Sequence, residues 1–187
     1  MRGTPMSMNR RDWIVGSLGL AASAAIAAAQ QHAHLAVLSP DSTSFEFFDP
    51  ATARDVEAVA AQIIPSDDGP GATEAGAVYF ADRALKTFAA EYAASFTDAL
   101  ADFNARRKKI FPGSSSFASL AREQQIQLLK SSEKTPFFDM MREITILAWL
   151  GPPEYGGNRN QVGWKYIGFD DAGFFEPPFG YYDKEAK

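Results

Sequence analysis

The chain has 187 residues, a formal net charge of −5 and no cysteine, and its only histidines are His32 and His34. An acidic chain does not suit a phosphate backbone, so nucleic acid is not an expected partner. Beyond residue 34 the chain cannot supply a haem attachment motif, a cysteine-ligated cluster, a histidine-based zinc site or a Ser–His nucleophile pair. We therefore expect no catalytic residue and no metal or cofactor bound by this chain.

The N-terminus has the features of an export signal. Arg10 and Arg11 precede an uncharged run from Ile14 to Ala29, which is rich in Ala, Gly and Ser and ends in residues that a signal peptidase accepts. The run is short and weakly apolar for a membrane span. We interpret residues 1–29 as a twin-arginine signal. The alternatives are an N-terminal helix of the mature protein and an uncleaved anchor. Without the signal, 158 residues with a charge of −7 remain, enough for one domain.

Residues 30–50 are predicted to be an N-terminal extension. Within it, "SFEFFD" (44–49) alternates briefly, and it either pairs as a short strand or lies against the body. Apolar residues then recur at helical spacing, which predicts about five amphipathic helices. Capping residues, prolines and glycines delimit them. In chain order we expect helices from Asp49 or Thr52 to Pro65, from Thr73 to Phe88, from about Glu91 to Lys109, from Ala121 to Ser131, and from Thr135 to Gly151.

The last part of the chain, residues 152–187, has a different character. Pro152 and Pro153 prevent continuation of the helix, and eight of the 19 residues from Trp164 to Tyr182 are aromatic, with glycines and prolines between them. The prediction is an all-α single domain over residues 51–187 that ends in an irregular, aromatic-rich tail.

A glycine-rich block, "EYGGNRNQVGWKYIGF" (154–169), opens this tail. A phosphate-binding loop would need a strand before the glycines and a helix after them, and neither is expected here. We interpret the block as a tight turn in which Gly157 and Asn158 adopt positive φ and present Tyr155 and Trp164.

Two other features of the sequence are candidate sites. The carboxylate pairs Asp67-Asp68 and Asp170-Asp171 stand beside Gly and Pro, which is typical of turns, although an independent enzyme would have to use Asp67, Asp68 or Asp170. The basic run Arg106 to Lys109 is interpreted as a solvated helix end, where cations suit the helix dipole.

Two blocks of the chain, residues 63–85 and 152–169, resemble the gluconate 2-dehydrogenase subunit 3 family. The resemblance implies a non-catalytic small subunit of a membrane-bound dehydrogenase complex that oxidises sugars, sugar acids or polyols. In such complexes a large flavoprotein of the glucose–methanol–choline type holds FAD, and a third, cytochrome c subunit often carries haem c. The small subunit supports folding, assembly and export of the large one through the twin-arginine machinery, to the periplasm or the periplasmic face of the inner membrane.

The resemblance also implies where the partner would bind. The glycine-rich block and the aromatic tail form the expected interface, with Tyr155, Asn158 and Trp164 as candidate anchors. Its candidate residues are Tyr155, Gly156, Gly157, Asn158, Gly163, Trp164, Ile167, Gly168 and Phe169. The alternative hypothesis is a free periplasmic sugar-binding module whose aromatic rings stack on sugars.

Overall fold

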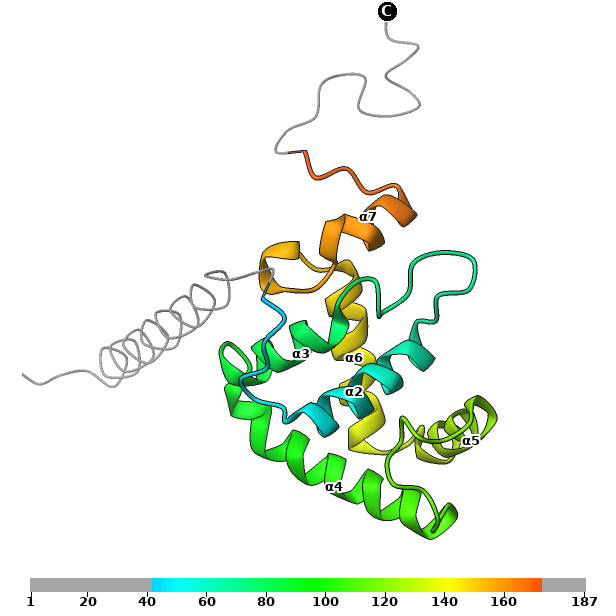
Figure 1. The fold of residues 1–187 in the computed structure, drawn as a ribbon. Helices are drawn as coiled ribbons and strands as arrows, with labels where there is room; N and C mark the ends of the chain where they lie inside the picture. The colour runs from blue at the N-terminus through cyan, green and yellow to red at the C-terminus, as the bar shows by residue number, and fades with distance from the viewer. Residues whose placement is uncertain (1–41, 173–187) are drawn as a thin grey trace, which may run out of the picture.

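The computed structural model describes residues 42–172, and all regular structure in this range is helical (Figure 1). Three short 3-10 helices connect the α-helices. The α-helices are α2 (Pro50–Ile63), α3 (Ala77–Lys86), α4 (Ala93–Ile110), α5 (Arg122–Ser132), α6 (Pro136–Leu150) and α7 (Val162–Ile167). The predicted all-α class is confirmed. Arg10 and Arg11 of the export signal and the aromatic residues after 172 lie outside the described residues.

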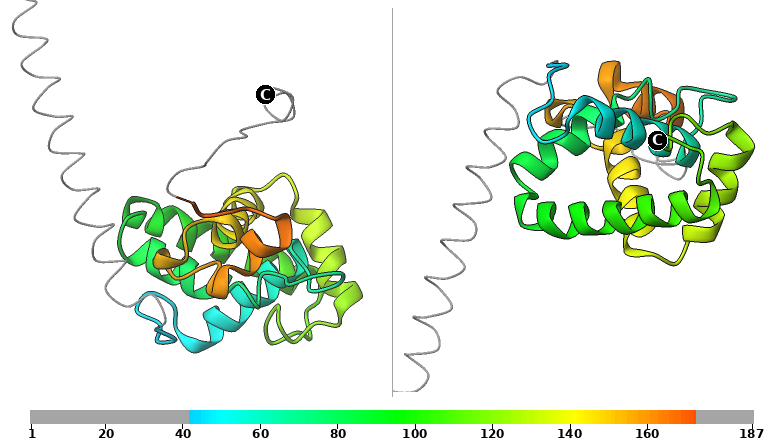
Figure 2. Two further views of the ribbon diagram at one scale, coloured as in Figure 1. Left: turned by 90° about the horizontal axis from the view of Figure 1, so that it is seen from above. Right: turned by 60° about the horizontal axis from the view of Figure 1, so that its bottom comes forward.

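Helix α6 is the central element of this fold. It contacts α2, α3, α4, α5 and α7, which are arranged around it as the views in Figure 2 show. Helix α4 crosses one end of the domain and α7 lies at the other, beyond the C-terminal end of α6 (Figure 1). No helix in the range 42–172 is long and apolar enough to cross a membrane.

The core forms where the apolar stripes of these helices meet α6. Phe137, Met141 and Ala148 are at most 1% exposed, and their spacing places them on one face of α6. The Phe137 ring stacks on Phe103 of α4, with 4.3 Å between the ring centroids, and Phe96 packs beside it at 6.0 Å. Aromatic rings from α4 and α6 thus fill the space between these helices.

The predicted helix starts at Asp49, Ala121 and Thr135 are confirmed, and the predicted start at Thr73 is wrong. Asp49, one of the two alternative caps, begins α2, and Thr135 caps α6 before a proline as predicted. The second predicted helix begins at Ala77 and not at Thr73, because residues 72–76 form turns that end in Gly76 with φ +70°. Glu74 stabilises these turns by accepting hydrogen bonds from Ser66 Oγ and Gly71 N.

The region after Gly151 is more ordered than the sequence predicted. The 3-10 helices Pro153–Tyr155 and Arg159–Gln161 precede α7, and Gly168, with φ +71°, follows its last residue. A helix of six residues is too short to show a periodic pattern, so the prediction of a wholly irregular tail was wrong for this segment. The segment 45–48 forms no strand; it lies against α3, as one of the two alternatives for "SFEFFD" stated.

We expect the cap of α2 to contribute measurably to stability. Asp49 accepts from Thr52 N at 3.0 Å, from Thr52 Oγ1 at 2.7 Å and from Ala51 N at 2.8 Å, and these bonds lower the pKa of the carboxyl. Asp49→Ala should lower the free energy of unfolding by about 1 kcal/mol at neutral pH, whereas Asp49→Asn should cost much less.

The effect of Asp49→Ala should also depend on pH. A lowered pKa in the folded state means that the stabilisation is present above the pKa of the unfolded chain and is lost as pH falls through the folded-state value. Urea unfolding of the wild type and of Asp49→Ala should give a difference in unfolding free energy that shrinks from neutral pH to pH about 2. An equal difference at both pH values would contradict the role of the ionised carboxylate.

Candidate functional site

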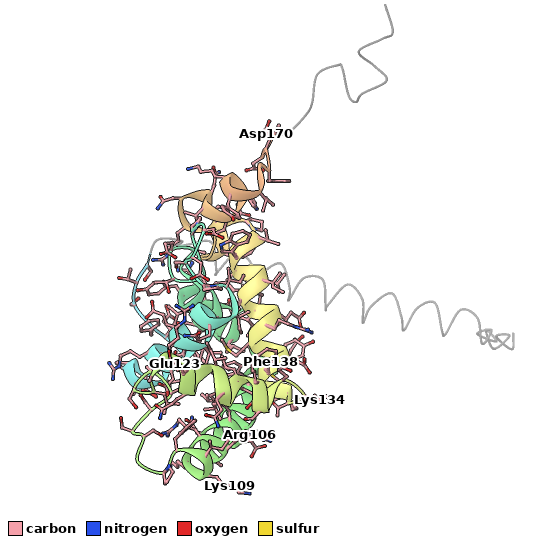
Figure 3. All side chains as sticks on the ribbon, turned by 90° about the vertical axis from the view of Figure 1, so that its right-hand side faces the viewer. Arg106, Lys109, Glu123, Lys134, Phe138 and Asp170 are labelled. Carbon is pink, nitrogen blue, oxygen red and sulfur yellow. The ribbon has the colours of Figure 1, made fainter. Side chains whose placement is uncertain are left out.

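The glycine-rich block forms a compact loop and α7 at the C-terminal end of α6. In Figure 3 this end, with Asp170 just after α7, lies opposite the end that carries Lys109. The block follows α6 directly, and its backbone turns back against the last residues of that helix: Asn158 N donates to Ala148 O at 2.5 Å. The block is therefore part of the fold as well as part of the surface.

Asn158 holds this loop together from inside. Its side chain is 0% exposed; Nδ2 donates to Gly151 O at 3.0 Å, and Oδ1 accepts from Gly163 N at 2.9 Å. The residue adopts a left-handed conformation with φ 41°, as predicted, which asparagine tolerates better than most residues. One buried side chain thus joins the end of α6 to the start of α7.

The glycines of the block are required for two different reasons. Gly156 has φ +92°, a conformation that disfavours other residues. Gly157 does not have positive φ, so that prediction was wrong. A Cβ at Gly157 would overlap the carbonyl oxygen of Ala148, and one at Gly163 would overlap that of Trp149. These two glycines are therefore set by close backbone approach to α6.

The residues expected to anchor a partner face the chain's own body. Trp164 is 8% exposed, and its Nε1 donates to Leu150 O while its ring contacts Phe169 at 5.0 Å. Tyr155 is half-buried, edge-on to Phe88 at 5.6 Å. Because Asn158 is also buried, we revise the expected roles: Asn158 and Trp164 position the loop and α7, and other residues are available for contact.

The exposed apolar residues lie on two helices that pack together at this end. Six of the eight large hydrophobic residues that are exposed in the range 42–172 are on α6, on α7 or directly after α7. We call them the apolar end surface: Ile146, Leu147, Leu150, Tyr166, Ile167 and Phe169. Ile167 and Phe169 were candidates from the sequence, whereas Tyr166 and the three residues of α6 were missed. Their signal was present, since the last turns of α6 are apolar on the face opposite Met141 and Ala148 as well as on the core face.

The other candidate sites are exposed carboxylates and the C-terminal end of α4. Asp67 lies 3.7 Å from Arg122, with both side chains largely exposed, and Asp170 and Asp171 are exposed. In the basic run, Arg107 departs from the predicted solvated helix end: it is 3% exposed and donates to Ser114 O at 2.6 Å. Within residues 42–172, no three His, Cys, Asp or Glu side chains are grouped as a metal ion would require.

An open groove of about 500 Å³ lies between α2, α5 and α6. Its lining is mainly aliphatic and includes Ile63, Ile126 and Ile146, with charged residues at the rim. Phe138 is the only aromatic residue among the described residues that line it, so the groove does not bring together the rings that stacking on a sugar would use.

The fold and the loop define the protein as a small all-helical domain in which a glycine-rich loop fixes an exposed apolar end surface. The chain belongs to the gluconate 2-dehydrogenase subunit 3 family: the family's sequence profile matches residues 50–171, which include every α-helix described above. The resemblance seen in the sequence is thereby confirmed, and the family's name denotes a subunit of a dehydrogenase complex. Neither curated proteins nor solved structures gave a significant match.

Asn158→Ala should destabilise the domain by about 2–3 kcal/mol, because it leaves a buried N–H at Gly163 and a partly buried carbonyl at Gly151 without these partners. Asn160→Ala is the matched control: Asn160 also has positive φ, 56°, but is exposed. Urea unfolding of the two variants separates the lost hydrogen bonds from backbone strain. Equal destabilisation would contradict the role given to the Asn158 side chain.

Proposed function

We propose that this chain is a non-catalytic small subunit that binds the large, FAD-containing subunit of a periplasmic dehydrogenase and supports its folding, assembly and twin-arginine export. The substrate class of the complex is a sugar, a sugar acid, a polyol or a glycoside. The proposal is supported by membership of the subunit 3 family and by one observation above all, the apolar end surface.

The exposure of these side chains favours a protein partner. Tyr166, Ile167 and Phe169 are each more than half exposed, and Leu147 is 50% exposed. Apolar surface gains about 25 cal/mol for each Å² removed from water, so burial of this end against a complementary apolar surface would be favourable. Exposed apolar patches, with aromatic residues among them, are typical of protein–protein contacts.

The rim of the apolar end surface adds a charge preference. Four acidic residues are exposed here, Glu143, Glu154, Asp170 and Asp171, against two basic residues, Arg142 and Lys165, so acidic groups are in excess. A partner surface with an apolar centre and basic residues around it would match this arrangement. Such charges mainly guide association and orientation, while the buried apolar contacts supply most of the affinity.

The proposed division of chemistry follows from the residues that each subunit supplies. FAD in the large subunit would accept the electrons of the substrate, and haem c in a third subunit would take them onward where such a subunit exists. This chain has no histidine or cysteine after His34 to serve as the base or redox group of that chemistry. Its role in the proposal is to hold the partner and to provide Arg10 and Arg11 of the signal.

The apolar end surface can be tested by a charge substitution. Ile167→Asp should reduce co-purification of the FAD-containing subunit by about tenfold or more, because a buried unpaired carboxylate is costly. Ile110→Asp is the matched control, since Ile110 is also an exposed isoleucine in a helix but lies at the end of α4. If both variants retain the partner equally well, this surface does not bind it.

The export role predicts a second result. Replacing Arg10 and Arg11 together by lysine keeps the charge and removes the arginine pair of the signal. Both this chain and the FAD-containing subunit should then be absent from the periplasmic fraction, as measured by immunoblotting and by dehydrogenase activity. Continued export of the large subunit in this strain would overturn the proposal that it travels with the small one.

A further inference from the structure

The first described residues of the chain are held by a buried carboxylate of α3. Asp82 is 3% exposed, and its oxygens accept hydrogen bonds from three consecutive backbone N–H groups: Glu46 at 2.8 Å, Phe47 at 2.9 Å and Phe48 at 2.7 Å. The acceptor lies 34 to 36 positions away in the sequence. Bonds between N–H groups and an ionised carboxylate are among the stronger hydrogen bonds, so this segment depends on α3 for its position.

The same segment is also held by the glycine-rich loop. Arg159 Nη2 donates to Ser42 O at 2.7 Å, and its Nε donates to Gly156 O at 3.2 Å. The guanidinium lies over the Tyr79 ring at 4.0 Å, and Tyr79 in turn stacks on Phe45 with ring centroids 5.3 Å apart. Arg159 therefore links the loop before α7 directly to the segment that follows the predicted leader.

We propose that residues 42–48 form a latch, held by hydrogen bonds to Asp82 and Arg159. The latch couples the loop before α7 to the part of the chain that carries the predicted signal, residues 1–29. The inference rests on the proposed function, because it names how docking at the apolar end surface would regulate export. Residues 42–48 form no regular structure of their own, so they can be fixed only after α3 and the loop have folded. The latch thus reports on the folded state of the domain.

The coupling has a physical route. The loop carrying Arg159 is joined to α7 by Asn158, whose side chain contacts both Gly151 and Gly163. A partner that packs on α7 would reduce the opening of this loop, and it would thereby favour the closed latch. By thermodynamic reciprocity, a closed latch favours partner binding to the same extent. Since the twin-arginine machinery accepts folded cargo, the latched state is the one suited to export.

The latch itself is tested by hydrogen exchange on the full chain alone. Asp82→Asn removes the charge, and the amides of residues 46–48 should exchange about tenfold faster or more, while those of α6 remain protected. Asp98→Asn, an exposed carboxylate of α4, is the matched control and should change neither. Unchanged exchange at 46–48 in Asp82→Asn would overturn the latch.

A second variant avoids burying an unpaired group. Phe45→Ala removes the ring that stacks on Tyr79 and leaves both Asp82 and Arg159 in place. It should speed exchange in the same segment with little change in the urea midpoint of the domain. Arg159→Ala should do the same at the Ser42 end of the segment. Wild-type exchange in both variants would count against the latch even if Asp82→Asn failed to fold.

The coupling is tested with the FAD-containing subunit. Its addition should slow exchange at residues 46–48 in the wild type and less so in Arg159→Ala. In cells, Arg159→Ala should lower co-purification of that subunit only by the coupling factor, while the exported complex should fall several-fold further than this loss of binding accounts for. Export at the wild-type level would overturn the regulatory role.

Failure of Ile167→Asp to reduce co-purification would instead count against the docking surface, while the exchange results on the chain alone would stand.

Discussion

The close contact between the glycine-rich loop and the last turn of α6 is the constraint on which the rest of this site depends. Gly157 and Gly163 lie so near the backbone of α6 that a Cβ at either position would overlap a carbonyl oxygen. Asn158 fills the remaining space, and it satisfies polar groups on both sides of the loop. The orientation of α7 follows from this contact, because Trp164 binds the carbonyl of Leu150 from the first turn of the helix.

The contact between the glycine-rich loop and α6 divides the residues of this region into two groups, those that hold the loop and α7 in place and those that are exposed. Asn158 and Trp164 are buried and hydrogen-bonded, whereas Ile167 and Phe169 are exposed on the same short segment. Helix α6 has a similar double role, since one face packs in the core and the last turns of the other face are apolar and exposed. Rigid support beneath an apolar surface lowers the entropic cost of binding, which is what a stable subunit contact requires.

Side chains connect residues 42–48 to α3 and to the glycine-rich loop. Asp82 and Arg159 come from α3 and from the loop, and each holds backbone groups of residues 42–48 that have no helix or strand partner. Buried backbone groups need such partners, so a segment without regular structure can be ordered only where side chains provide them. The two ends of the described chain are thereby brought into one network.

The sequence by itself determined the helical class, the caps at Asp49 and Thr135 and the family, because these depend on local spacing and on short motifs. It located the glycine-rich block and the positive φ of Asn158. It misjudged the backbone of Gly157 and missed the six-residue helix α7, and it did not show that Asn158 and Trp164 are buried. Only the tertiary structure decided these, since whether a side chain is buried or exposed depends on which distant backbone lies against it, and no local pattern records that distance.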